Sequence, residues 1–253
     1  MSDFPTASLV TAGAILVTVL LSSPMPATAQ TPAGKQISSV PRLPNGKPDF
    51  NGVWDRPFVA DMSKDAGAAQ KGPGTIPFTP EYAQIFKNYD VAKFDYTGHC
   101  LPLGLTRSMN SPMPIRIVQT SDLVVILYEA WNMFEIIHTD GLPHPGSDNR
   151  DPLWMGHPVG KWDGDTLVVD TTGFNTRTNL DTVGHPHSDA LHTVERFTRT
   201  DEKHIAYEIT IEDAKAFTRP WKNTRIFTLR PDWELMEYSC EENNKDFNEG
   251  HIK

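Results

Sequence analysis

The sequence lacks the short motifs that mark the commonest nucleotide, hydrolase and haem sites. It contains no Gly-x-Ser-x-Gly elbow, no phosphate-binding P-loop and no Gly-x-Gly-x-x-Gly dinucleotide fingerprint. These absences argue against ordinary serine hydrolase, nucleotide and NAD chemistry. Neither of the two cysteines stands in a Cys-x-x-Cys-His segment, which argues against covalently attached haem.

Positive charge is also scarce. The chain has 23 Lys and Arg residues against 32 Asp and Glu residues, a formal net charge of −9, and no Lys/Arg cluster. Because an acidic chain repels phosphate backbones, we expect no nucleic-acid partner. Beyond the first thirty residues, no apolar run approaches the roughly 20 residues that a membrane-spanning helix needs. We therefore expect no transmembrane segment once a signal peptide has been removed.

The first 29 residues have the organisation of a secretory signal peptide. Residues 12–21 form an apolar run, and Ala27-Thr28-Ala29 provides a small-x-small cleavage site. The n-region departs from the usual pattern because it has Asp3 and no Lys or Arg. The alternative is a cytoplasmic chain with a buried N-terminal helix. Cleavage after Ala29 leaves 253 − 29 = 224 residues and predicts a periplasmic or secreted protein.

The two cysteines, Cys100 and Cys240, form an even pair. In an oxidising compartment such a pair most simply makes a disulfide, here between the loop around Cys100 and the last strand-like segment. Two free buried thiols are the alternative.

Beyond residue 100, helical periodicity is almost absent and strand-like segments recur with turns between them. Before that point, Thr79-Pro80-Glu81 starts an amphipathic helix over about 80–94. The strand-like segments are residues 115–119, 123–128, 134–138, 166–170, 193–198, 204–211, 225–229 and 234–240. This pattern is typical of an antiparallel sandwich or barrel.

We predict a mainly β fold, an antiparallel β-barrel with one flanking α-helix. Residues 1–29 are the signal peptide, 30–48 a flexible leader rich in Pro and Gly, and 49–253 a single barrel domain. The segment Gly52-Val53-Trp54 at the first strand resembles the opening of lipocalin-type (calycin) barrels. That resemblance implies a Trp that packs across the barrel base.

The segment 184–195 gathers three imidazoles and two carboxylates within twelve positions. His185, His187 and His192 are candidate ligands of a divalent metal (Zn, Fe, Cu or Mn), since imidazole is the commonest ligand of transition metals. Pro186 separates two of them and places the segment in a loop or on an edge strand. Acid–base chemistry without a metal and a purely structural role are the alternatives.

Glu195, His192 and Asp189 are the candidate catalytic residues, with Glu195 nearest to the imidazoles. Carboxylates inside otherwise apolar strands either face water or face a cavity, where burial raises the pKa and suits acid–base work. Five glutamates lie inside such apolar strand-like segments, namely Glu129, Glu135, Glu195, Glu208 and Glu237. The candidate ligand-binding residues are His138, Glu129 and Tyr128.

Residues 102–243 resemble a family of secreted bacterial proteins of unknown function. The similar phrases are residues 100–104, 117–120, 125–129, 139–141, 164–170, 184–189 and 237–240. The resemblance implies membership of that family and no particular activity.

We therefore hold two main hypotheses of function. The first is a periplasmic or secreted enzyme that acts on a small sugar derivative or aromatic by hydrolysis, elimination or isomerisation. Its site would be a His/carboxylate cluster, with or without a metal. The second is a lipocalin-like protein that binds a small ligand without chemistry. A structural protein of the cell envelope is a third hypothesis.

Overall fold

The computed structural model describes residues 39–67, 70–144, 151–242 and 244–245. The predicted signal peptide and the first part of the predicted leader lie outside the described residues. Within the described ranges, no helix is both long and apolar enough to cross a membrane.

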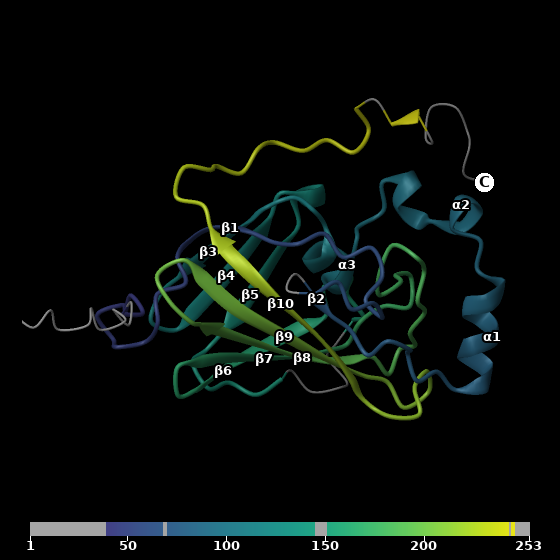
Figure 1. Ribbon diagram of the computed structural model, residues 1–253, viewed down its shortest axis with the longest axis horizontal. Helices are drawn as coiled ribbons and strands as arrows, with labels where there is room; N and C mark the ends of the chain where they lie inside the picture. Colours follow the sequence, from purple (N-terminus) through teal and green to yellow (C-terminus); the bar gives the residue numbers. More distant parts are fainter. Residues whose placement is uncertain (1–38, 68–69, 145–150, 243, 246–253) are drawn as a thin grey trace, which may run out of the picture. The chain divides into compact units, whose positions relative to one another are not determined.

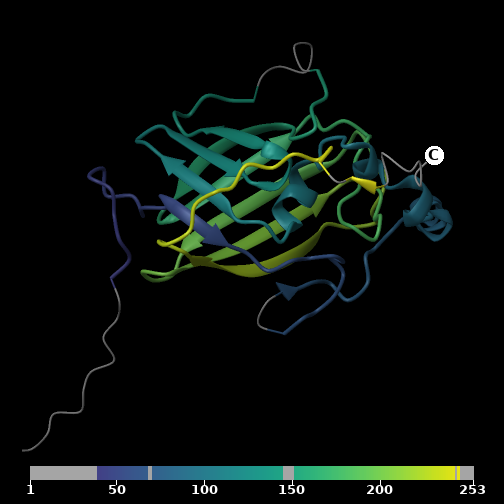
Figure 2. The same cartoon turned by 90° about the horizontal axis from the view of Figure 1, so that it is seen from above.

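The main body is a closed β-barrel of nine strands, nearly all antiparallel (Figures 1 and 2). The strand order is β1-β3-β4-β5-β6-β7-β8-β9-β10, and β10 pairs again with β1 to close the ring. A two-residue strand, β2, pairs with β10 outside the ring. The strands are β1 Gly52–Asp55, β2 Gln70–Lys71, β3 Ile115–Gln119, β4 Leu123–Tyr128, β5 Phe134–His138, β6 His157–Asp163, β7 Thr166–Thr172, β8 His192–Arg199, β9 His204–Glu212 and β10 Trp221–Leu229. The predicted fold class, a mainly β antiparallel barrel, is confirmed.

Alternation of side chains decides what fills the barrel. In β9, Ile205, Tyr207, Ile209 and Ile211 are fully buried, whereas the residues between them are only half-buried. Successive side chains of a strand point to opposite faces, so one face of each strand builds the core and the other meets water. Trp54 of β1 is buried in this core and donates its indole N–H to the Phe50 carbonyl at 2.9 Å.

The join between β5 and β6 has the fewest registered pairs in the ring. These strands run parallel and share a single registered pair, His138 with Val159. Gly160 lets them approach there, because a Cβ on it would lie 2.6 Å from Ile137 Cγ2. The sequence pattern missed β6, since Pro158 and Gly160 interrupt its alternation.

The helices are short, and Figure 1 shows α1 and α2 beyond one end of the barrel and α3 close to its strands. They are α1 Pro80–Asn88, α2 Val91–Phe94, α3 Leu105–Asn110, and the 3₁₀ turns η1 Tyr96–His99 and η2 Ala130–Asn132. The helix predicted over 80–94 is therefore divided into α1 and α2. Tyr89 ends α1 in an extended conformation, and the Asp90 carboxylate caps a new start by accepting from the Ala92 N–H. Helix α3 was not predicted, because its six residues include only two apolar ones, Leu105 and Met109, although all six are buried.

The segment predicted as a last strand, 234–240, is not a strand. It leaves β10 and runs along the barrel without pairing in the sheet (Figure 1). Side chains of the β4–β5 turn hold it instead. The Met236 N–H donates to Glu129 Oε2 at 2.8 Å, and Asn132 Nδ2 donates to the Tyr238 carbonyl at 2.6 Å.

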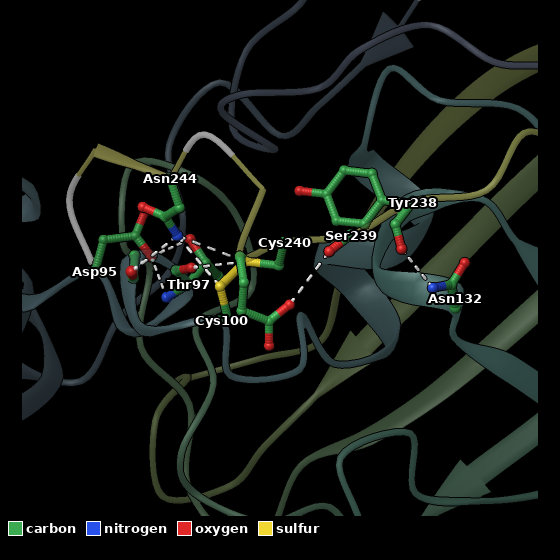
Figure 3. The surroundings of a disulfide bond; sticks show 10 residues. Asp95, Thr97, Cys100, Asn132, Tyr238, Ser239, Cys240 and Asn244 are labelled. Carbon is green, nitrogen blue, oxygen red and sulfur yellow. Dashed lines mark hydrogen bonds between the residues drawn. A yellow bond between two sulfur atoms is a disulfide. The ribbon is translucent and has the colours of Figure 1, made fainter. Parts of the chain in front are cut away.

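The predicted disulfide between Cys100 and Cys240 is confirmed (Figure 3). It joins the end of η1 to the C-terminal segment across 140 positions of sequence. Cys100 adopts a left-handed conformation (φ 56°), which turns the chain out of η1 toward its partner. The bond therefore fixes the end of a segment that the sheet does not hold.

Candidate functional site

Two carboxylates lie inside the barrel. Glu135 on β5 and Glu195 on β8 are 2% and 0% exposed, because both fall on the inward positions of their strands. Tyr128 donates its hydroxyl to Glu135 Oε2 at 3.0 Å, and Tyr207 donates to Glu195 Oε1 at 2.7 Å. The second oxygen of each carboxyl has no hydrogen-bond partner among the described residues.

Two buried arginines accompany these pairs. The Arg56 guanidinium lies 5.8 Å from the Tyr128 ring centroid, and that of Arg225 lies 5.3 Å from the Tyr207 ring centroid. Both donate Nη1 to the Met109 carbonyl of α3, at 2.6 and 2.9 Å. Burial lowers the pKa of Arg56 to about 10, which leaves it charged at neutral pH. The backbone of α3, rather than a carboxylate, therefore anchors both cations.

The surroundings favour the neutral forms of both carboxyls. Burial raises the pKa of Glu195 to about 7, although the Tyr207 hydroxyl and the Arg225 charge both lower it. Burial also raises the pKa of Glu135 well above its ordinary value, and the Glu195 charge adds to that rise. Like charges in a site of low dielectric cannot both ionise readily. The pair thus holds at least one proton near neutral pH.

A pocket of about 550 Å³ opens where β5 and β6 separate. We call it the side pocket, and its lining residues are 132–136, 138, 142–143 and 153–159. Most are apolar, and four large ones are exposed, namely Phe134, Ile136, Leu142 and Leu153. Exposed apolar side chains that gather in one hollow are typical of a ligand site. Glu135 belongs to this lining, but its side chain faces the interior, whereas Phe134, Ile136 and His138 expose their outward side chains to the pocket.

His185 belongs to a group that could hold a metal. Its Nδ1 lies 2.6 Å from Asp181 Oδ2 and 3.9 Å from Asp61 Oδ1, and one ligand atom of each residue lies within 4.8 Å of the others. Asp181 also accepts the Met62 N–H at 2.8 Å, and the His185 ring packs 4.3 Å from the Phe86 ring. Two carboxylates and an imidazole suit several divalent metals.

His187 makes a separate set of contacts. Its Nδ1 meets the Ser188 carbonyl at 2.8 Å and its Nε2 meets the Thr178 hydroxyl at 2.7 Å. Burial lowers the pKa of His187 and so favours the neutral ring, in which Nδ1 donates to the Ser188 carbonyl and Nε2 accepts from the Thr178 hydroxyl. Both ring nitrogens are therefore occupied within the protein.

His192 lies on the outer wall of the barrel. Its Nε2 meets Asp170 Oδ2 at 2.9 Å and its Nδ1 meets Glu212 Oε2 at 3.2 Å, so the ring joins β7 to β9. His144 Nε2 meets the other Asp170 oxygen at 2.7 Å. His192 and Glu195 are three residues apart on one strand and thus lie on opposite faces of the barrel wall.

The remaining predicted site residues lie in different places. Asp189 is exposed and paired with Lys215. His138 is exposed on β5 and lines the side pocket, while Tyr128 is buried against Glu135. Glu129 holds the C-terminal segment. The structure thus places His138 at the side pocket and Tyr128 inside the barrel. The three imidazoles of residues 185–192 lie in three separate environments.

Sequence reasoning named Glu135 and Glu195 but missed Arg56, Arg225 and the Asp61–Asp181 pair. One signal was present for Arg225, because it alternates with Asn223 and Phe227 on the inward face of β10. No known family model matches the sequence, and no curated protein matches it either. Function is therefore inferred from the geometry alone.

Proposed function

We propose that the protein binds a small, largely apolar organic molecule in the side pocket. The observation that carries this proposal is the hollow itself, about 550 Å³ in volume and lined mainly by apolar side chains at the join between β5 and β6. Ligand pockets have volumes of about 300–1,000 Å³ and combine apolar walls with a few polar groups. Asn132, His138 and His157 supply polar groups here.

The test is a titration with N-phenyl-1-naphthylamine, a neutral apolar dye that fluoresces when it leaves water. We expect saturable binding with a stoichiometry of one. Ile136→Arg places a guanidinium among the apolar lining and should weaken binding at least about tenfold, since an unpaired charge is costly to desolvate. Val118→Arg is the matched control, because Val118 is a similarly exposed outward residue of β3 that lies outside the side pocket.

The two variants distinguish binding in the side pocket from binding elsewhere. Binding that Ile136→Arg abolishes and Val118→Arg retains supports the side pocket. Equal loss in both variants, or no saturable binding to the unmodified protein, contradicts the proposal.

Catalysis by proton transfer is a second candidate, favoured by the buried pair Glu135 and Glu195. Such an enzyme would isomerise or eliminate from an aromatic or sugar-derived substrate that reaches the pair between β5 and β6. We would follow deuterium exchange at the carbon next to the carbonyl of 1-tetralone in D₂O. Glu195→Gln should slow any enzymatic exchange about 100-fold or more, the usual contribution of a general base. Exchange no faster than in buffer alone argues against this candidate.

We also propose that the group Asp61, Asp181 and His185 binds a divalent metal such as Zn, Fe, Cu or Mn. Purified protein should contain near-stoichiometric metal that His185→Ala removes. His187→Ala is the control and should retain it. Metal-free protein after growth in metal-rich medium contradicts the proposal.

The proposed location is the periplasm or the exterior of the cell. The disulfide supports it, because such bonds persist in oxidising compartments and are rare in the cytosol. A fusion of the first 29 residues to alkaline phosphatase, which is active only after export, tests the signal peptide directly.

A further inference from the structure

The C-terminal segment braces one wall of the side pocket. We call residues 233–240 the strap. Three contacts join it to the turn between β4 and β5, namely Met236 N–H to Glu129, Asn132 to the Tyr238 carbonyl, and the Tyr238 ring stacked 4.8 Å from the Trp131 ring. Figure 3 shows the Asn132 contact and the disulfide at opposite ends of the last part of the strap. Asn132 and the following Met133 line the side pocket.

The braced turn is conformationally unfavourable by itself. Trp131 and Asn132 have φ values of 59° and 51°, a left-handed region that side chains with a Cβ rarely adopt. A hairpin turn can hold two such residues in succession and favours Asn there, but a bulky side chain such as Trp131 keeps this conformation only where the surrounding structure holds it. The strap supplies contacts to both residues. The turn's shape, and with it this wall of the side pocket, therefore depends on the strap.

The strap is held at its far end by a covalent bond. Beyond β10 it adds no strand to the sheet, and Cys240 at its end is bonded to Cys100. Asn244 continues the attachment by donating Nδ2 to the Gly98 carbonyl at 3.3 Å. Without the disulfide, the strap would be held by individual polar contacts and one ring stack, each worth about 1 kcal/mol. Such a segment opens locally at low cost.

We propose that the disulfide controls the side pocket through the strap, so that reduction of Cys100–Cys240 weakens ligand binding. This inference rests on the proposed binding function. The reductant is a dithiol, whose two thiols give two electrons and two protons to the bond. The products are the Cys100 and Cys240 thiols and the oxidised, cyclic dithiol. The released strap frees Trp131 and Asn132, and the wall at Asn132 and Met133 becomes mobile.

The test compares affinity for N-phenyl-1-naphthylamine in the oxidised protein and after dithiothreitol treatment, with thiol titration to show two free thiols. We expect affinity to fall about fivefold or more on reduction, the usual lower range of coupling between two sites. Cys240→Ser should bind as weakly as the reduced protein and should not respond to dithiothreitol. Hydrogen exchange at residues 129–133 should become faster in both.

A variant with the disulfide intact separates local release from general unfolding. Tyr238→Ala removes the ring stack on Trp131 and should weaken binding of the dye while the bond remains. Ser239→Ala is the matched control, because the Ser239 hydroxyl donates to Glu241 at 3.5 Å, within the same segment, and bonds to no other part of the described chain. Unchanged affinity in Tyr238→Ala overturns the proposal even if reduction unfolds the protein.

The two proposals fail in different ways. Equal affinity in the oxidised and fully reduced proteins overturns control by the strap and leaves the side pocket intact. Absence of binding to the oxidised protein overturns both.

Discussion

At the scale of the residue, the same side chain has opposite roles on the two faces of one wall. Glu195 of β8 faces inward and is bonded to Tyr207, whereas Glu208 of β9 faces outward and pairs with Lys222 at 2.7 Å. Only the position within the strand's alternation distinguishes them. The inward position removes water from Glu195, which raises its pKa and makes its ionisation costly to the fold.

The raised pKa of Glu195 predicts a particular dependence of stability on pH. Its pKa is about 7 in the folded protein and 4.5 ordinarily, so the folded state binds the proton more tightly. The stabilisation is full below about pH 4.5 and is lost as the pH rises through 7, by on the order of 3 kcal/mol. Urea unfolding of the unmodified protein and of Glu195→Gln at each pH should show this difference. A stability difference between the two proteins that is constant over this range contradicts the assignment.

Residue-level prediction from the sequence succeeds where the partner is near in the chain and fails where it is remote. Alternation in β9 correctly divides the inward isoleucines from the outward residues. Sequence reasoning did not find Asp61 as a partner of His185 or Asp170 as a partner of His192, because both carboxylates come from other segments of the chain. Spacing within 184–195 therefore suggested a shared site for three imidazoles whose actual neighbours depend on tertiary contacts.

At the scale of the element, the join between β5 and β6 positions the side pocket. Antiparallel neighbours elsewhere in the ring share between two and eight registered pairs, and this parallel pair shares one. The strands can then diverge and leave the hollow between them. Regular strands are predictable from alternation. Strand β6 was missed because Pro158 and Gly160 interrupt its alternation, and the strap was wrongly predicted as a strand because its composition resembles that of a strand.

Because β5 and β6 approach closely at Gly160, adding a single methyl group there should destabilise the fold. In Gly160→Ala, the new methyl would meet Ile137 Cγ2 at 2.6 Å and Thr139 Cγ2 at 2.8 Å. Because the surrounding core is packed, we expect a loss of about 1–3 kcal/mol in the free energy of unfolding. Thermal and urea unfolding measure it. The adjacent exposed Lys161→Ala is the control, and equal stability of the two variants would contradict the tight join.

At the scale of the whole molecule, the closed ring of strands holds buried polar groups inside, and the side pocket lies at the join between β5 and β6. Helix α3 and the arginines Arg56 and Arg225 occupy the interior near the buried carboxyls. The barrel class was predictable, because a run of short strands without helical periods leaves few alternatives. The join between β5 and β6 could not be predicted, because it depends on which strands become neighbours in the folded protein.

Ligand binding predicts stabilisation of the whole fold. A ligand at 100 times its Kd should stabilise the folded state by about 2.7 kcal/mol, if it does not bind the unfolded chain. For a domain of this size the Tm should rise by roughly 5–10 °C. Ile136→Arg should abolish the rise, and Val118→Arg should keep it. A rise that is the same in both variants would mean that the dye binds elsewhere.

The most direct test of the central claim is the position of the bound ligand. Of the six tryptophans, Trp154 lines the side pocket, whereas Trp54 and Trp221 are buried in the core. Their indole N–H signals can be followed by NMR while N-phenyl-1-naphthylamine is added. The account predicts a saturable shift of the Trp154 signal, with the Trp54 and Trp221 signals nearly unchanged. Saturable binding that leaves Trp154 unmoved and shifts the core tryptophans would contradict it.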